Sequence, residues 1–318
     1  MRKIGIPEIE DIATGAALLG AGGGGDPYVG KLVAIGAVRD RSPVTLLDPE
    51  EVPDDALVVP IAMMGAPTVL AEKAIGGTEY QKLFEMVSKF FGQKIYAFMP
   101  IEAGGVNSML PIAAAARLGM PMVDVDGMGR AFPELQMVTF TIGGMKATPM
   151  ALVDEKGNSC VFETITNKWT EELARAVTMS CGASVSVSLY PMSGKQMKEF
   201  GVRGIVTRSQ RLGQAIRTIK DCGDKTPEEH FLEMAEGFKL FKGKIEHVEY
   251  SKGGQEFCAG GQDKSLYVVR ESAFNVVGEG RQRDAEKAER WERERRTYET
   301  RYNIGSQCFD CKYLGGGA

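Results

Sequence analysis

The stretch Gly20-Ala21-Gly22-Gly23-Gly24-Gly25-Asp26-Pro27 lies between two segments with helical patterns, and five of its eight residues are glycine. Because glycine has no side chain and accepts positive φ, such a loop can turn sharply and expose several backbone N–H groups. Asp26 is a typical N-cap and Pro27 a typical first helical residue, so we expect a helix from Tyr28 to Val38. A glycine-rich turn at a helix N-terminus favours an anionic ligand, and the alternative is a tight connection between two packed helices.

Apolar runs alternate with helical patterns on both sides of this loop. Ala56–Met64 is a continuous apolar segment, which is typical of a buried strand, and Lys94–Pro100 and Pro121–Val125 predict two further strands. Helices are expected at Pro7–Leu19 and at about Glu79–Phe91. Strands that alternate with helices predict an α/β domain with a mostly parallel sheet.

The pattern changes after Gln136. Gln136–Thr141, Met150–Asp154 and Ser159–Glu163 predict strands, and Ala183–Tyr190 alternates with period two. We therefore expect an α/β domain over residues 1–165 and a β-rich domain over 166–280. The remaining residues, 281–318, form a charged and atypical tail that is too polar to pack a core.

Composition excludes several classes of protein. The chain of 318 residues is 43% hydrophobic and 25% charged, which is typical of a soluble globular protein. A formal net charge of −4 argues against nucleic acid as the main partner. No apolar run approaches the length of a membrane helix, and the N-terminus lacks the apolar core of a secretory signal. These features predict a cytoplasmic protein.

Three polar turns follow the predicted parallel strands, at Met63–Thr68, Glu102–Ser108 and Asp124–Glu134. Because the carboxyl ends of parallel strands meet at one edge of a sheet, we expect the three turns to form one site. The candidate residues of this site are Glu102, Asn107, Asp124, Asp126, Arg130 and Glu134, together with Gly65 and the loop residues Gly23, Gly24, Gly25 and Asp26.

The carboxylates among these residues suit acid–base or metal chemistry. Glu102, Asp124 and Asp126 could bind a divalent metal ion, position a water or supply a general base with a raised pKa. Only two histidines occur, which excludes a three-histidine metal site. Arg130 could bind a substrate carboxylate or pair with Glu134. The structural alternative is that the aspartates cap loops. No nucleotide is expected, because no Gly-Lys-Ser/Thr follows the glycine loop.

Four blocks of the chain resemble, in order, the S-methyl thiohydantoin desulfurase family: Gly22–Pro27, Met63–Pro67, Pro100–Ser108 and Asp124–Met137. This family was long known as a domain of unknown function found alongside hydantoinase and oxoprolinase subunits. The resemblance covers about residues 8 to 245. It implies a three-layer N-terminal α/β domain and a distorted, barrel-like, β-rich C-terminal domain.

The resemblance also implies a reaction, in which water replaces a thiol on a small thiohydantoin ring to give a hydantoin. Glu102, Asp124 and Asp126 would then surround the reacting carbon, while the glycine loop and Arg130 would hold an anionic substrate tail. The alternative is a non-catalytic or regulatory subunit of a hydantoinase/oxoprolinase complex. The implied partners are a cyclic amide substrate and either further copies of the chain or such subunits.

The end of the chain departs from the family pattern. After Ser251 the sequence shows little strand pattern, and it then continues into the charged run Gly280–Arg301 and the pair Cys308 and Cys311. We interpret this as a divergent end or the result of a frameshift that replaces the last strands of the second domain.

Overall fold

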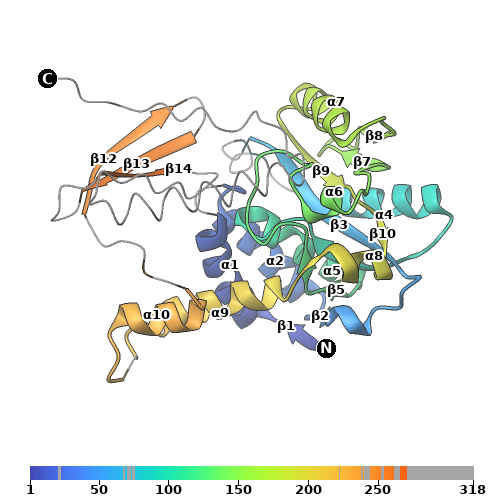
Figure 1. Ribbon diagram of the computed structural model, residues 1–318. Coiled ribbons are helices and arrows are strands. Elements are labelled where there is room, and N and C mark those ends of the chain that lie inside the picture. The colour runs from blue at the N-terminus through green and yellow to red at the C-terminus, as the bar shows by residue number, and fades with distance from the viewer. Residues whose placement is uncertain are drawn as a thin grey trace, which may run out of the picture. The chain divides into compact units, whose positions relative to one another are not determined.

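The computed structural model describes residues 1–20, 23–66, 69, 73, 76–221, 223–237 and 239, and the backbone of three further strands within 244–270. It divides into two compact units, Met1–Leu240 and Phe241–Ala318 (Figure 1). The charged run Gly280–Arg301 and the pair Cys308 and Cys311 lie outside the described residues.

The first unit is built on a nine-stranded sheet within the described residues. Across the sheet the strands are β1 (Arg2–Ile4), β2 (Val44–Leu47), β5 (Met122–Val123), β4 (Ile95–Pro100), β3 (Leu57–Gly65), β9 (Ser184–Ser188), β7 (Met150–Val153) and β8 (Ser159–Phe162), and β10 (Met192–Ser193) also pairs with β3. The central strands β2, β5, β4 and β3 are parallel, whereas the flanking strands pair antiparallel. The predicted α/β class with a parallel centre is therefore confirmed.

The sheet has a buried core on each face. Side chains on a strand alternate between faces, so Val59 and Ile61 of β3 join one core while Val58 and Ala62 join the other. The first core also takes side chains from helices α1, α2, α4 and α5, and the second from α7 and α8. The helices are α1 (Ile6–Gly20), α2 (Pro27–Asp40), α4 (Thr78–Phe91), α5 (Leu110–Leu118), α6 (Thr139–Ile142), α7 (Asn167–Ser180), α8 (Gly194–Phe200), α9 (Ile205–Arg217) and α10 (Pro227–Ala235), with 3-10 turns η1 (Pro49–Glu51) and η2 (Gly105–Ser108).

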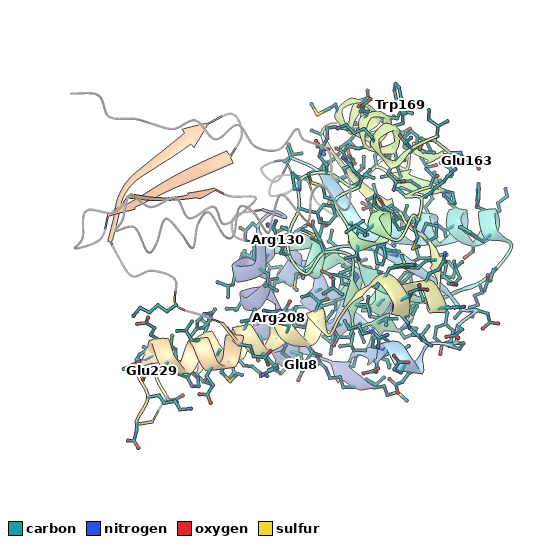
Figure 2. All side chains as sticks on the ribbon, in the orientation of Figure 1. Glu8, Arg130, Glu163, Trp169, Arg208 and Glu229 are labelled. Atoms are coloured by element: carbon teal, nitrogen blue, oxygen red, sulfur yellow. The ribbon has the colours of Figure 1, made fainter. Side chains whose placement is uncertain are left out.

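The same sheet spans the predicted domain boundary at residue 165. Strand β9 lies between β3 and β7, and Ile61 of β3 pairs with Ser188 of β9. All five residues of β9 are buried, so its alternating sequence does not mark an exposed face. Only one side of helix α7 packs against the rest of the unit: Ala174 is buried, whereas Trp169 is half exposed at the periphery (Figure 2).

Two expectations from sequence were wrong. The predicted strand Gln136–Thr141 instead leads into the short helix α6, because the N–H of Thr139 donates to the carbonyl of Gly127 at 2.7 Å rather than to a strand partner. The chain after Ser251 also continues as strands. In the second unit, β12 (Lys244–Ser251), β13 (Gly254–Gly260) and β14 (Leu266–Arg270) form an antiparallel sheet. The barrel-like form of this part stays a prediction.

Helices α1 and α9 cross at very short range through two glycines. A Cβ atom at Gly15 would lie 1.8 Å from the carbonyl oxygen of Ser209, and one at Gly213 would lie 1.9 Å from that of Asp11. The guanidinium of Arg217 forms a bidentate ion pair with Asp11, with N–O distances of 2.8 and 3.0 Å. None of the helices within the described residues combines the length and apolarity needed to span a bilayer.

We expect Gly15→Ala to lower the free energy of unfolding by at least about 2 kcal/mol, because the new methyl group forces α1 and α9 apart. Gly36→Ala in α2 is the matched control, since a Cβ there meets no atom within 4 Å. It should stabilise the protein by about 0.5–1 kcal/mol through helix propensity. Urea unfolding of the two variants measures both effects, and equal stabilities would contradict the close crossing.

Candidate functional site

Glu102 lies just after β4, at the carboxyl end of the parallel strands, and its side chain is buried. One carboxylate oxygen, Oε1, accepts a hydrogen bond from Nδ2 of Asn107 at 2.6 Å. The other, Oε2, accepts from the backbone N–H of Phe132 at 2.9 Å. Two separate turns thus hold Glu102 in one orientation.

Asn107 connects this carboxylate to the end of β3. It lies in η2, where its Oδ1 accepts from the backbone N–H of Met63 at 2.8 Å. Its Nδ2 also donates to the carbonyl of Met63 at 3.2 Å. The structure therefore brings the end of β3 together with the turn after β4, as the sequence predicts for adjacent parallel strands.

Asp126 adds a second buried carboxylate from the next turn. It ends β6 (Val125–Asp126), which pairs with β11 (Val202–Arg203). Its carboxylate accepts from the N–H of Met128 at 3.1 Å and from that of Gly129 at 2.8 and 3.0 Å. The backbone of Ala103, the residue after Glu102, also hydrogen-bonds to it, and the charge of Glu102 acts on it.

Burial shifts the titration of this pair toward neutral pH. Loss of solvent raises the pKa of Glu102 to about 7, against the opposing effect of its bonds from Asn107 and Phe132. Loss of solvent, together with the nearby charge of Glu102, raises the pKa of Asp126 to about 8, while its backbone donors oppose the shift. Near neutral pH the carboxyl groups of Glu102 and Asp126, the Glu102–Asp126 pair, are therefore each partly protonated.

Asp124 is directed to a different place. Its carboxylate accepts from the backbone N–H groups of Val206, at 2.7 Å, and Thr207, at 3.2 Å, and from the Thr207 hydroxyl. These backbone N–H groups lie in the first turn of α9 and have no partner within the helix, and a negative charge is favourable there. This geometry corresponds to the capping alternative, and a catalytic role of Asp124 stays a prediction.

The three carboxylates are not grouped as ligands of one ion. Among the described residues, no three His, Cys, Asp or Glu side chains come together in a way that could hold a metal ion. Asp124 is engaged by α9, whereas the other two carboxylates are engaged by the turns around residues 103–132. A divalent cation stays a prediction from the sequence.

The described part of the glycine loop packs directly against the turn that carries Glu102 and Asn107. The carbonyl of Gly24 accepts from the N–H of Val106 at 2.8 Å. A Cβ at Gly24 would lie 2.5 Å from the carbonyl oxygen of Gly104, and one at Gly105 would lie 2.3 Å from those of Gly24 and Gly25. Gly23 lies against Ala131, where an added Cβ would be 3.2 Å from the Ala131 methyl group. The glycines thus allow contact between two backbones.

The other predicted ligand-binding residues lie around this centre. Asp26 caps α2 as expected, since its Oδ1 accepts from the N–H of Tyr28 at 2.8 Å. Gly65 has a φ of +150° and abuts β9, with the Ala183 oxygen 2.2 Å from where a Cβ would be. Glu134 forms an ion pair with Lys168 at 3.1 Å. Arg130 is partly exposed and follows the Asp126 turn (Figure 2).

Comparison with known proteins agrees with the resemblance seen in the sequence. The family model described as S-Me-THD-like, N-terminal domain, matches residues 7–164, and that described as S-Me-THD-like, C-terminal domain, matches residues 165–261. An X-ray structure of a protein from Chromobacterium violaceum has a similar fold, with a TM-score of 0.72, at 21% sequence identity over 89% of this chain and 79% of that chain. No curated protein matches the sequence.

We expect Asp124→Asn to lower the free energy of unfolding by about 1–3 kcal/mol, because the amide places N–H groups against the N-terminal donors of α9. Asp26→Asn is the matched control, since Asn is as good an N-cap as Asp at the exposed start of α2. Thermal and urea unfolding measure both variants. An Asp124→Asn protein as stable as Asp26→Asn would contradict the capping role.

Proposed function

Because the chain belongs to the S-Me-THD-like family, we propose that it is a hydrolase of small cyclic amides that releases a thiol from an S-methyl thiohydantoin to give a hydantoin. The observation that carries this proposal is the buried Glu102–Asp126 pair, whose pKa values of about 7 and 8 suit proton transfer at neutral pH.

The reaction needs two proton transfers from the water. Water adds across the ring carbon–nitrogen double bond that bears the S-methyl group, so one proton leaves the attacking oxygen and the ring nitrogen gains one. The carbonyl then forms as the carbon–sulfur bond breaks, so the second proton leaves the oxygen and the departing sulfur gains one to become methanethiol. The sum is one substrate and one water converted to one hydantoin and one methanethiol, and in each of the two steps a single carboxyl group can take the proton from oxygen as a base and return it as an acid.

Glu102 is the group in this pair that we assign to the proton transfer. It keeps a small exposed fraction of 5%, and its neighbour Asn107 keeps 7%, whereas Asp126 is fully buried. Asp126 therefore acts on Glu102 from within the core through their mutual charge effect. Asn107 fixes the Glu102 carboxylate, and Arg130 supplies a partly exposed guanidinium for an anionic ring substituent.

We expect Glu102→Gln to reduce kcat for thiol release from an S-methyl thiohydantoin by about 10²–10⁴-fold, because Gln cannot exchange a proton. Glu163→Gln, an exposed position at the periphery (Figure 2), is the control and should match the wild type. A colorimetric thiol assay measures the product. Wild-type turnover in Glu102→Gln would overturn the assignment, and wild-type protein that releases no thiol would favour the regulatory-subunit alternative. Chelation followed by metal addition tests whether a divalent cation takes part.

The pH dependence gives a separate prediction. Glu102 accepts a proton only when it is ionised, so kcat/KM should rise with pH and reach half its maximum near the raised pKa of about 7. A solvated glutamate would give a midpoint near 4.3. Initial rates between pH 5 and pH 9 measure the profile, and a rate that stays constant from pH 5 to pH 8 would contradict Glu102 as the base.

A further inference from the structure

The large sheet of the first unit ends at β8, which among the described residues pairs with β7 alone. At the turn end of this pair, the N–H of Asp154 donates to the carbonyl of Asn158 at 3.0 Å. Backbone groups that face the neighbour alternate with groups that face away along an antiparallel strand, so the N–H and carbonyl groups of Ser159 and Val161 point away from β7. Each of these two residues therefore offers one donor and one acceptor at the open edge.

The sequence of β8 leaves this edge unprotected. Open edges of sheets usually carry a charged residue or a proline, which discourages pairing with another strand. Strand β8, Ser159–Phe162, is Ser-Cys-Val-Phe and contains neither. The strand at the opposite end of the sheet, β1, begins with Arg2 and Lys3, whose positive charges would meet if two copies paired there. Of the two ends of the sheet, β8 is thus the one that permits self-pairing.

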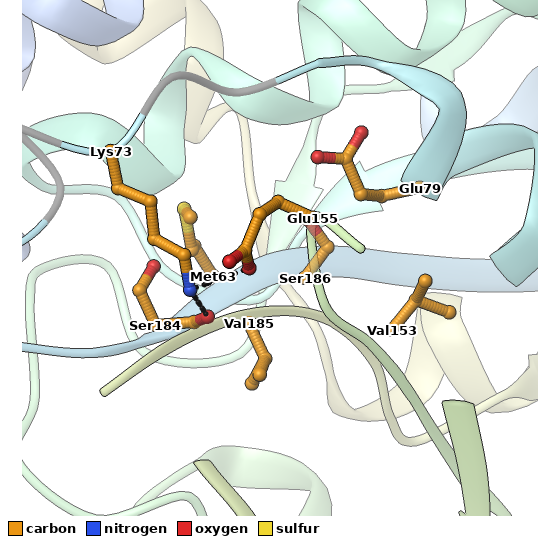
Figure 3. Close-up of a pocket in the computed structure, with 8 residues that line it drawn as sticks. All are labelled: Met63, Lys73, Glu79, Val153, Glu155, Ser184, Val185 and Ser186. Atoms are coloured by element: carbon orange, nitrogen blue, oxygen red, sulfur yellow. Dashed lines mark hydrogen bonds and ion pairs between the residues drawn. The ribbon is translucent and has the colours of Figure 1, made fainter. Parts of the chain in front are cut away.

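The hairpin that carries β8 is held in one form. The carboxylate of Asp154 accepts from the N–H of Asn158 at 2.7 Å in the turn. The ammonium of Lys73 lies 2.6 Å from Oε2 of Glu155 in the same turn and donates to the carbonyl of Ser184 in β9 at 2.9 Å (Figure 3). An edge that is already ordered loses less conformational entropy when a partner binds.

Helix α7 lies over the sheet next to β8. Thr164 follows β8, and its hydroxyl hydrogen-bonds to that of Thr170 in α7, with 2.6 Å between the oxygens. The far side of the helix is fixed elsewhere, because the carboxylate of Glu171 accepts from the N–H of Leu135 at 3.1 Å. Leu173, three residues after Thr170, therefore lies on the side of α7 nearer β8.

The surface of α7 beside this edge is apolar and exposed. Trp169 is 49% exposed and Leu173 is 42% exposed, and they are one helical turn apart. Ile165, four residues before Trp169, is 79% exposed. Neighbouring large apolar side chains that remain exposed are typical of an interaction surface.

A second copy of the chain fits both the open edge and the apolar helix. When two identical edge strands pair antiparallel, the twofold axis is perpendicular to the sheet, so the two copies of α7 lie on the same face and beside each other. We propose that two copies join β8 to β8 in one continuous sheet and pack their α7 helices together across the axis. Within β8, the register that uses all the outward groups pairs Ser159 with Val161 of the second copy and places the axis at Cys160.

The charges that flank β8 are complementary in this register. Lys156 precedes the strand and Glu163 follows it, and both side chains are exposed. Gly157 then faces Glu163 of the second copy, so Lys156 of each copy lies close to Glu163 of the other. None of the residues assigned to thiol release belongs to this interface, and the inference is therefore independent of the proposed function.

Sedimentation velocity of the full chain over a range of concentrations tests the interface. We expect the wild type to form a dimer and Val161→Lys to raise its dissociation constant by about tenfold or more, because two lysines then meet at the seam. Leu32→Lys in α2 is the matched control, since Leu32 is a comparably exposed apolar residue far from β8 in the sheet order, and it should dimerise as the wild type does. Lys156→Glu should weaken the dimer by about fivefold, and Lys156→Glu combined with Glu163→Lys should restore it.

A wild type that is monomeric at every concentration would overturn the inference, as would a dimer that Val161→Lys leaves intact. Circular dichroism establishes that each variant is folded. Cys160 tests the register directly, because non-hydrogen-bonded antiparallel neighbours have Cα atoms about 4.5 Å apart, within the range of a disulfide. Diamide, which oxidises adjacent thiols, should link the copies covalently in the wild type and in Cys181→Ser but not in Cys160→Ser. A covalent dimer that persists in Cys160→Ser would contradict the register.

Discussion

The side-chain amide of Asn107 is the interaction on which the candidate site depends. It accepts from the backbone N–H of Met63, donates to the Met63 carbonyl and donates to the carboxylate of Glu102. Because Met63 belongs to β3 and Glu102 follows β4, one planar group fixes the ends of two adjacent parallel strands. Buried amides with all their polar atoms paired are rigid, so Glu102 keeps its orientation in a region that excludes bulk water.

The glycine loop serves this arrangement by allowing close approach. Gly24 and Gly25 lie against Gly104 and Gly105 at distances that no side chain would permit. The turn with Glu102 and Asn107 is thereby held between the sheet and the loop that leads into α2. The expected anion cradle and this packing role use the same glycines, and the packing explains why several are needed in succession.

Much of this could be predicted because it depends on local sequence. Apolar runs indicated the parallel strands, Asp26-Pro27 indicated a helix start, and turns after adjacent strands indicated where Glu102, Asn107 and Asp126 would meet. The hydrogen-bond partners of Asp124 could not be predicted from the sequence, since they lie some 80 residues later in α9. Cytoplasmic location and oligomeric or hydantoinase/oxoprolinase partners stay predictions of the sequence.

Burial brings the titration of Glu102 and Asp126 into the neutral pH range. The most direct measurement is a carbon-13 NMR titration of the side-chain carboxyl carbons, with Glu102→Gln used to assign the Glu102 signal. We predict that Glu102 titrates near pH 7 and Asp126 near pH 8, well above exposed carboxyl groups. Titration of both groups below about pH 5, the range of ordinary carboxyl groups, would contradict the claim.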